Sequence, residues 1–447
     1  MPWSERAIAA HVDQVNLRGE LPAMVFEELR LRGEELFTAR FTTADGVGRP
    51  LATQASIPTK RDAGGSMFDR AGGPDASSCA GCHNQPAIGG AGDFATNIFI
   101  AEAPGGESAP MPNPALANER GTTHIFGAGL IELLAREMTM DLHQIRENAV
   151  LKARETGKPV SLPLTTKGVD FGTIVASADG AFDTSGIEGV DPDLIIKPFG
   201  QKGVFVSLRE FTVHVLNHHH GMQADERFGF AQTGELDFDG DGVSGEISPG
   251  DVSALVAWQA GLKPPSPGVP ENEMWKTAAK AGSNHFDAFG CTSCHKRALP
   301  LESLKFSDPG PINAQGTLSQ TAVPEPAIYD LALLEWASSL PRDENDKVLV
   351  PLFGDLKRHR IADEGGPLGN EKLPQRKVEP HMFMTAELWG LSATAPYGHR
   401  NDFTTIDEIV RAHGGEARVS RQAYVNAAPE DRDALIAYLR TFVLEGE

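Results

Sequence analysis

The sequence is poor in cysteine, with four among 447 residues, and all four belong to two short motifs. Residues 79–83 read CAGCH and residues 291–295 read CTSCH. So few cysteines in so long a chain make a disulfide framework unexpected, and a four-cysteine zinc site would leave both motif histidines unexplained. The spacing C-x-x-C-H is the attachment signature of c-type haem. We therefore expect two covalently attached haems, held by Cys79, Cys82 and His83 and by Cys291, Cys294 and His295.

Positive charge and long apolar runs are also scarce. The chain carries 40 Lys and Arg against 61 Asp and Glu, a net charge of −21, which argues against nucleic acid and anionic membrane surfaces as partners. The balance favours a basic redox partner, although plain solubility explains it equally well. No apolar run approaches the roughly 20 residues that span a bilayer. The first six residues lack the apolar core of a secretory signal. Because c-type haem is normally attached outside the bacterial cytoplasm, we expect a mature periplasmic chain whose leader has been removed.

The chain contains an internal repeat. Residues 251–258, DVSALVAW, resemble residues 431–438, DRDALIAY, and each segment lies well downstream of a C-x-x-C-H motif. A proline-rich run over 263–270 is expected to act as a stiff linker between two units. At 447 residues the chain is long enough for two or three domains with their own cores. We therefore expect a mainly α fold of two haem domains, 1–265 and 266–447, with long loops.

Three further segments of the first unit have a recognisable character. Residues 4–41 are expected to form a helical lead-in, because apolar residues recur among charged ones. Residues 158–206 alternate short apolar runs with Gly, Asp and Pro, which predicts a small β-rich insertion. Residues 126–138 predict an apolar helix that contains Glu132. A solvated or partner-bound carboxylate is favoured there over a catalytic one, since charged side chains lie mostly at the surface.

A histidine-bearing helix is predicted to begin at Ser207, where Glu210 completes a capping-box pattern. Of the three consecutive histidines that it carries, His219 lies near the centre of the apolar face, His218 lies at its margin and His220 faces away. His219 is therefore either a satisfied core histidine or a group on the open axial side of a haem. The apolar face is the set Leu208, Phe211, Val215, His219 and Met222.

Residues 237–248, DFDGDGVSGEIS, match the first half of a calcium-binding loop. Position 12 is Ser248 where a bidentate Glu is usual, which leaves Glu246 or Asp251 as substitutes. Asp-Gly turns without metal are the alternative, but three carboxylates so close together repel one another unless a cation is bound. The predicted ligands are the carboxylates of Asp237, Asp239 and Asp241 and the carbonyl of Val243.

A second candidate iron ligand lies near the C-terminus. Residues 405–412 predict a helix that delivers His413 directly before two glycines. A histidine at such a helix end is well placed to reach an iron from beyond the helix terminus.

In combination, these motifs resemble the dihaem oxidoreductases of the bacterial cytochrome c peroxidase superfamily, in particular their peroxidase-like branch of similar size. The resemblance runs from about residue 25 onward. Its strongest part covers residues 388–399, LWGLSATAPYGH, and 411–417, RAHGGEA. The other matching segments are residues 78–86, 126–132 and 289–295.

The resemblance implies two cytochrome c-like domains in which His83 and His295 are the proximal iron ligands. It makes His413 the distal ligand of the second haem, where the family typically has Met, and a bis-histidine iron would have the lower potential. It also implies a calcium ion between the haems, bound partly by the carbonyls of Thr394 and Pro396.

The sequence departs from the family around the first haem. Phe211 and His219 stand where the family has a glutamine and an acidic residue that handle peroxide, and Gln201 stands in place of an interhaem tryptophan. His219 could take over the acid/base work of a peroxidase that uses hydrogen peroxide and a small redox protein or other electron donor. It could equally bind the iron, which would leave an electron-transfer module. A third alternative is a haem oxidase that acts on a protein or organic substrate.

Overall fold

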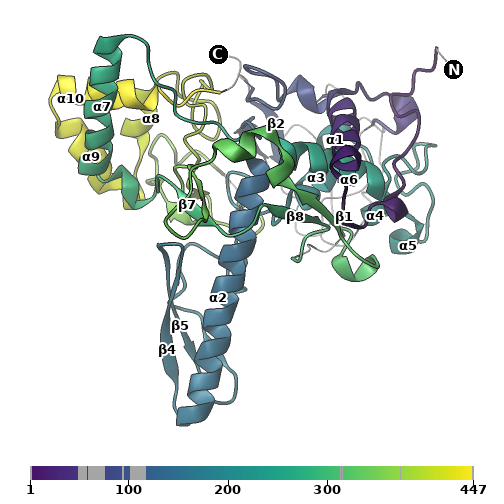
Figure 1. The fold of residues 1–447 in the computed structure, drawn as a ribbon, viewed down its shortest axis with the longest axis horizontal. Helices are drawn as coiled ribbons and strands as arrows, with labels where there is room; N and C mark the ends of the chain where they lie inside the picture. Colours follow the sequence, from purple (N-terminus) through teal and green to yellow (C-terminus); the bar gives the residue numbers. More distant parts are fainter. Residues whose placement is uncertain are drawn as a thin grey trace.

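The computed structural model describes residues 3–48, 58, 76–92, 95–100, 117–312, 314, 316–372 and 374–444. Within them, the chain forms helices and several small sheets (Figure 1). The helices are α1 (Ala23–Thr38), α2 (Ala128–Thr156), α3 (Leu208–Val215), α4 (Asp225–Phe228), α5 (Phe230–Thr233), α6 (Pro249–Gly261), α7 (Glu273–Ala288), α8 (Ile406–Ala412), α9 (Arg418–Asn426) and α10 (Pro429–Leu439).

The sheets are small, and they join distant parts of the sequence. In one of them β1 lies parallel to β9, which is antiparallel to β8, so residues 19–20 pair with residues 327–328. The expectation of a mainly α chain is therefore wrong, and the fold is mixed. The strands are β1 (Gly19–Glu20), β2 (Ala95–Ile100), β3 (Ala117–Gly121), β4 (Val160–Thr166), β5 (Val169–Ala176), β6 (Phe182–Asp183), β7 (Leu299–Leu301), β8 (Lys305–Asp308), β9 (Ala327–Asp330), β10 (Val348–Val350), β11 (Arg358–Arg360) and β12 (Met382–Met384).

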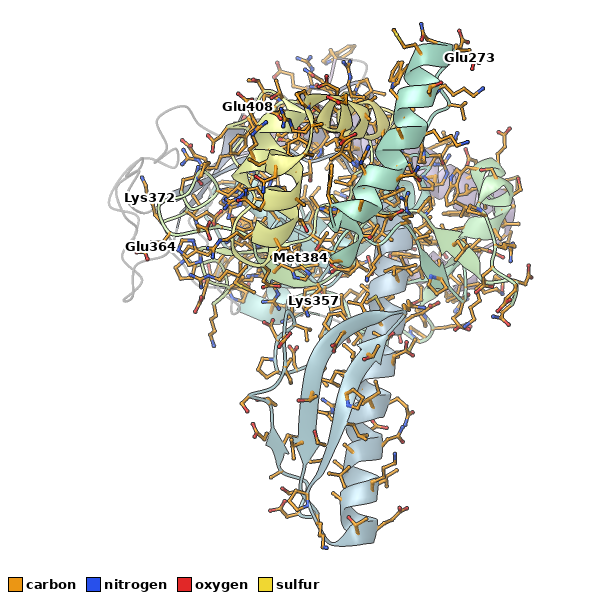
Figure 2. The ribbon with its side chains drawn as sticks, turned by 90° about the vertical axis from the view of Figure 1, so that its left-hand side faces the viewer. Glu273, Lys357, Glu364, Lys372, Met384 and Glu408 are labelled. Carbon is orange, nitrogen blue, oxygen red and sulfur yellow. The ribbon has the colours of Figure 1, made fainter. Side chains whose placement is uncertain are left out.

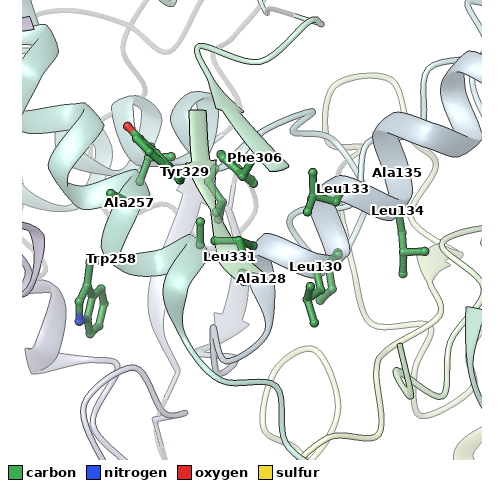
Figure 3. Packing of buried hydrophobic residues seen from close by; sticks show 14 of the residues in the cluster. Ala128, Leu130, Leu133, Leu134, Ala135, Ala257, Trp258, Phe306, Tyr329 and Leu331 are labelled. Atoms are coloured by element: carbon green, nitrogen blue, oxygen red, sulfur yellow. The ribbon is translucent and has the colours of Figure 1, made fainter. Parts of the chain in front are cut away.

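The main hydrophobic core gathers α1, α6, the start of α2 and strands β8 and β9. Trp258 of α6, Leu130 of α2 and Tyr329 of β9 are all buried in it (Figure 3). The helical lead-in is shorter than expected, because α1 begins only at Ala23, after Pro22. Buried residues between 299 and 352 belong to this same core. The main core therefore crosses the boundary expected between residues 265 and 266.

A second, smaller core forms around α7 and α10, with Phe286, Leu435 and Phe442 buried in it. Both cores contain a pair of helices that touch at a glycine. Gly33 of α1 lies against Ala254 of α6, and Gly282 of α7 lies against Ala434 of α10. Because α6 and α10 carry the two copies of the sequence repeat, the repeat corresponds to two equivalent helix crossings.

The predicted β-rich insertion forms an arm that projects from the rest of the chain, as Figures 1 and 2 show from two sides. Strands β4 and β5 pair as an antiparallel hairpin, β6 adds a short third strand, and the hairpin packs against the end of α2. Helix α2 ends at Thr156 and is followed by Gly157, whose φ of 66° is the left-handed conformation common after a helix C-terminus. Beyond β6 the insertion is mostly irregular as far as Ser207.

Within the described residues, no helix combines the length and the apolar character that crossing a bilayer requires.

Candidate functional site

Both C-x-x-C-H motifs fold into the same tight turn. Residues 79–81 and 291–293 form short 3-10 helices. In the first motif, the amide of His83 donates to the carbonyl of Cys79 over 3.0 Å, and in the second the amide of His295 donates to that of Cys291 over 2.9 Å. Each turn is held against the first helix of its helix pair, α1 or α7. The two motifs thus present their thiols and histidine in matching local frames.

The motif histidines are oriented in the way that metal-binding histidines usually are. Nδ1 of His83 donates to the carbonyl of Gly90 over 3.3 Å, and Nδ1 of His295 donates to that of Phe353 over 2.9 Å. Such bonds fix the ring and direct the lone pair of Nε2 toward a metal. Burial lowers the pKa of both histidines to about 4, so both are neutral at pH 7, the form that binds iron.

The motif cysteines fit thioether formation better than a thiolate metal site. No disulfide links the four cysteines. Burial raises the pKa of Cys79 to about 12 and that of Cys291 to about 11, so these two are neutral thiols. A zinc site would need thiolates, which are stabilised by positive charge rather than by apolar burial. The residues present therefore fit covalent haem at both motifs.

The structure brings His413 into the surroundings of His295. His413 follows the end of α8, which begins after a capping box at Thr405, close to the predicted bounds. Its Nδ1 donates to the carbonyl of Ile409 over 2.7 Å, which leaves Nε2 for a ligand. Burial is the main cause of the lowered pKa of His295. The charge of the neighbouring His413 lowers this pKa further. Direct ligation by His413 stays a prediction.

The three consecutive histidines lie on a π-helical turn, Leu216–His220, rather than on a regular α-helix. In α3 itself, Ser207 accepts from the amide of Glu210 over 3.0 Å, as the capping pattern predicted. A π-turn has hydrogen bonds from i to i+5 and shifts the side chains away from their α-helical directions. His220 is only 3% exposed. The prediction that His220 faces away from the apolar side of its helix is therefore wrong.

His220 is the functional candidate that the sequence did not reveal. Its Nδ1 donates to the carbonyl of Ala76 over 2.7 Å, and its Nε2 lies 3.5 Å from the sulfur of Cys79. Since Nδ1 carries the proton and burial lowers the pKa of His220 to about 4, Nε2 is an acceptor for the Cys79 thiol. The ring also meets the edge of Phe41, with centroids 5.7 Å apart. A pattern of 3.6 residues per turn could not have found this contact.

His219, the predicted catalytic residue, also lies near the first motif. Burial is the main cause of the low pKa of His83, and the charge of His219 lowers it further. His219 packs edge-on against His218, with ring centroids 4.8 Å apart. The structure thus gathers His83, His219 and His220 around the first motif, as it gathers His295 and His413 around the second.

The predicted calcium ligands Asp237, Asp239 and Asp241 converge, with one carboxylate oxygen of each lying within 4.8 Å of the others. Gly240 and Gly242 take left-handed φ values of 76° and 93°, which the sharp turn of such a loop requires. Burial, together with the nearby Asp241 and Asp237, raises the pKa of Asp239 to about 7.

The carbonyl ligands proposed for calcium lie in loops. The amide of Val243 donates to Asp241 over 2.7 Å, which folds Val243 into the acidic turn. Thr394 and Pro396 lie in the loop that follows a turn in which the amide of Ala393 donates to the carbonyl of Gly390 over 3.0 Å. Metal ligation by the carbonyls of Val243, Thr394 and Pro396 stays a prediction.

Three other residues singled out in the sequence have structural contacts. Glu132 is buried, accepts from Arg136 over 2.5 Å and accepts from the amide of Leu208 over 2.7 Å. It therefore anchors the start of α3. Phe211 packs edge-on against Phe205, with centroids 5.2 Å apart. Gln201 donates to the carbonyl of Gly121 over 3.2 Å.

A charged histidine borders the second motif. His359 donates from Nε2 to Asp355 over 2.8 Å and from Nδ1 to Glu416 over 2.7 Å, and Nδ1 lies 3.9 Å from the sulfur of Cys294. Burial alone would lower the pKa of His359, but bonds and charge from Asp355 and Cys294 outweigh it and raise the pKa to about 11. His359 is thus an imidazolium at pH 7.

No family model matches the chain. In sequence it is 27% identical, over 163 residues, to the cytochrome-c peroxidase IdrP2 of Pseudomonas sp. (strain SCT). The match covers 34% of this chain and 35% of that protein, so the chain spans about a third of the length of the curated relative that it matches.

Two solved structures are similar only loosely. A hydrazine synthase of Kuenenia stuttgartiensis matches with a TM-score of 0.37 and 14% identity, over 98% of this chain and 97% of its own. A MauG-like protein associated with microbial copper homeostasis matches with a TM-score of 0.30 and 15% identity, over 61% of this chain and 79% of its own. At these scores the likenesses bear on neither fold nor activity.

Proposed function

We propose that the protein is a periplasmic c-type dihaem oxidoreductase that reduces hydrogen peroxide at the N-terminal haem, with electrons relayed by the C-terminal haem. Haem, held covalently at the two motifs, would supply electron storage and the iron that binds peroxide. The similarity to a cytochrome-c peroxidase over a third of the chain supports this class of activity.

The observation that carries the proposal is the equivalence of the two motif regions. Each combines a C-x-x-C-H turn, a glycine-mediated helix crossing and a half-buried motif histidine whose Nδ1 donates to a backbone carbonyl. Each also has a further histidine close enough to lower the pKa of the motif histidine. This is His219 in the first region and His413 in the second. Two cytochrome c-like units, one for each haem, account for all of these features together.

Within this proposal, His219 would serve the peroxide bound at the first haem, while His220 would hold the attachment turn. An imidazole moves a proton between the two peroxide oxygens well, because its ordinary pKa lies near neutral pH. His220 is fixed by its bond to Ala76 and lies beside the attachment cysteine, so it positions the turn. His219 remains for the acid/base work.

The second haem site has the character of an electron relay. His295 and His413 would both hold the second haem iron, which suits electron transfer rather than substrate binding. The net charge of −21 favours a small basic redox protein as the electron donor.

The acidic turn is proposed to hold calcium. The convergence of the Asp237, Asp239 and Asp241 carboxylates and the left-handed glycines between them support this assignment. Hard oxygen ligands of this kind suit calcium. The carbonyl of Val243 is expected to be a further ligand in this turn. The carbonyls of Thr394 and Pro396 are expected to contribute to a separate calcium site between the haems.

Absorption and EPR spectra of the oxidised and half-reduced protein test the proposal. We expect one iron to be high-spin, or to become so on half-reduction, and to respond to peroxide. The His219→Ala variant should reduce peroxide about 10²–10⁴-fold more slowly, the usual contribution of a general acid/base group. The matched control is His143→Ala, because His143 lies on the projecting arm, where it donates to the carbonyl of Asp193.

A non-enzymatic electron-transfer module is the second candidate, because the proximity of His219 to His83 also suits a closed bis-histidine iron. Two low-spin irons in both redox states, without a spectral response to peroxide, would establish it and overturn the peroxidase.

A further inference from the structure

The acidic turn lies next to the segment that carries the three histidines. The carboxylate of Glu246 accepts from the amide of Gln223 over 2.7 Å, and Gln223 is three residues beyond His220. Immediately after them, Ala224 and Ile247 form a parallel bridge, and the amide of Asp225 donates to the carbonyl of Ile247 over 2.9 Å. The acidic loop and the end of the π-turn are therefore held together along their backbones.

The structure also distinguishes the two residues that could replace the missing ligand at position 12. Asp251 is engaged elsewhere, since it accepts from the amide of Ser248 over 3.0 Å and from Nδ1 of His11 over 2.5 Å. Glu246 is only 3% exposed, and the charged groups that act on it are Asp237, Asp239 and Asp241. Glu246 therefore belongs to the acidic group.

One oxygen atom in this group lacks the partner that a buried carboxylate needs. Asp239 is 5% exposed, and its Oδ1 has no hydrogen-bond partner among the described residues. Within the same residues, no Lys, Arg or His forms an ion pair with Asp239 or Glu246. A buried carboxylate is costly unless a positive charge or a metal accompanies it.

Contacts continue from Glu246 to the histidines through glycines. Gly46 lies directly against the Glu246 carboxylate, and Gly221 lies directly against the carbonyl of Gly48. The amide of Gly48 donates to the carbonyl of His220 over 3.2 Å. Because glycine leaves no side chain to absorb a displacement at these points, a shift of the Glu246 carboxylate would move the backbone of the π-turn.

We propose that a divalent cation bound by Glu246 together with Asp237, Asp239 and Asp241 sets the position of the π-turn, and with it His219 and His220, on the distal side of the first haem. This inference rests on the calcium site proposed above and adds Glu246 as the ligand that transmits binding. Without the cation, the four crowded carboxyl groups must bind protons or move apart, and this loosens the turn between Leu216 and Gln223.

Amide hydrogen exchange on the haem-loaded full chain, with and without Ca²⁺, tests this inference. Chelator-treated protein is titrated with CaCl₂ at constant ionic strength, and binding is followed separately by calorimetry. At Ca²⁺ one hundred times above Kd, exchange within residues 216–224 should slow by up to about 100-fold, if the openings release the cation. If exchange is unchanged at saturating Ca²⁺, the coupling is overturned. If no Ca²⁺ binds at concentrations up to about 10 mM, the site itself is overturned.

The Glu246→Gln variant separates a ligand from a merely structural residue. Its amide oxygen can still accept from Gln223, so the chelated variant should be no less stable than the chelated parent. It should bind Ca²⁺ at least about tenfold more weakly, because affinity follows the charge of the ligands. Equal affinity for Ca²⁺ would remove Glu246 from the site. Asp343→Asn is the matched control, because Asp343 also accepts backbone amides within an acidic turn.

The haem content of the same samples shows whether the haem proposal holds, independently of the cation. A chain that binds Ca²⁺ and orders residues 216–224 but carries no haem would overturn the role at a haem while it retains the cation site. A haem-loaded chain that does not bind Ca²⁺ would do the reverse. In the loaded protein, we also expect chelation to change the spin state of the first haem and not of the second.

Discussion

Gly282 of α7 lies directly against the backbone carbonyl of Ala434 in α10, and an added Cβ atom would overlap the carbonyl oxygen. Gly33 of α1 meets Ala254 of α6 in the same way. Neither glycine adopts a left-handed conformation. The close approach of the two helices therefore explains why glycine stands at each position. The two crossings place α6 and α10 at equivalent positions beside their C-x-x-C-H turns.

The Gly282→Ala variant should therefore destabilise the C-terminal core although alanine favours helix. Overpacking a tight contact costs about 1–3 kcal/mol, which exceeds the gain of roughly 1 kcal/mol in helix propensity. Guanidinium denaturation of the haem-loaded protein measures the difference. Lys280→Ala, at an exposed position of the same helix, should change stability by less than about 0.5 kcal/mol. A Gly282→Ala variant as stable as the parent would show that the helices can separate freely.

Local features were the most predictable from sequence. The N-cap at Ser207, the helix that ends before His413 and the repeat carried by α6 and α10 all depend on neighbouring residues. The contact of His220 with Cys79 was not predictable, because it depends on a π-turn that changes the direction of the side chains.

Long-range pairing was also beyond the sequence patterns. Strand β1 pairs with β9 across some 300 residues, and this pairing carries residues 299–352 into the first core. Strands as short as β1, with two residues, have no detectable period of their own. The sequence also could not decide between Glu246 and Asp251 as the fourth acidic ligand. That decision depends on distant partners, because His11 and Val12 donate hydrogen bonds to Asp251.

The His413→Ala variant should convert one of the two irons to high-spin. The half-buried imidazole is held by its bond to Ile409, so no neighbouring side chain is expected to replace it. EPR and the absorption spectrum of the oxidised protein measure the change. His143→Ala serves as the control and should leave both irons unaltered. An unchanged spectrum in His413→Ala would disprove the ligand assignment.

His359 should make stability depend on pH above neutrality. Its pKa is raised to about 11 in the folded chain against an ordinary value of about 6.5. The folded state therefore binds the proton more tightly. Its stabilising contribution is complete below pH 6.5 and is lost as pH rises toward 11, by the linkage of proton binding to folding.

The His359→Gln variant should accordingly be about 3–5 kcal/mol less stable at pH 6, because it leaves Asp355 buried without its charged partner. The difference from the parent should shrink steadily up to pH 10. Urea denaturation at a series of pH values measures it. His285→Gln, which removes a histidine paired with Asp431 near the surface, should give a small difference. A loss that does not vary with pH would contradict a charged His359.

Asp308 connects helix α3, which leads into the histidine-bearing π-turn, to the sheet formed by β1, β9 and β8. Both of its oxygens accept from Nη1 of Arg209 over 2.9 Å, and Oδ2 also accepts from Ser253 over 2.6 Å and from Tyr329 over 2.9 Å. Arg209 in turn binds Glu226 over 2.6 Å. The network thereby joins α3, α4, α6, β8 and β9 in one buried cluster.

Asp308→Asn keeps the size of the side chain but removes its charge, and it can turn an amide donor toward the guanidinium of Arg209. The change should cost about 1–3 kcal/mol, because charged buried hydrogen bonds are lost while Glu226 still neutralises Arg209. Asp346→Asn is the control, since Asp346 forms a solvent-exposed pair with Arg342 over 3.3 Å and its loss should cost less than about 1 kcal/mol. Guanidinium denaturation compares the two. Because Asp308 anchors the helix that leads into the π-turn, its loss should also speed amide exchange in residues 216–220, whereas Asp346→Asn should not.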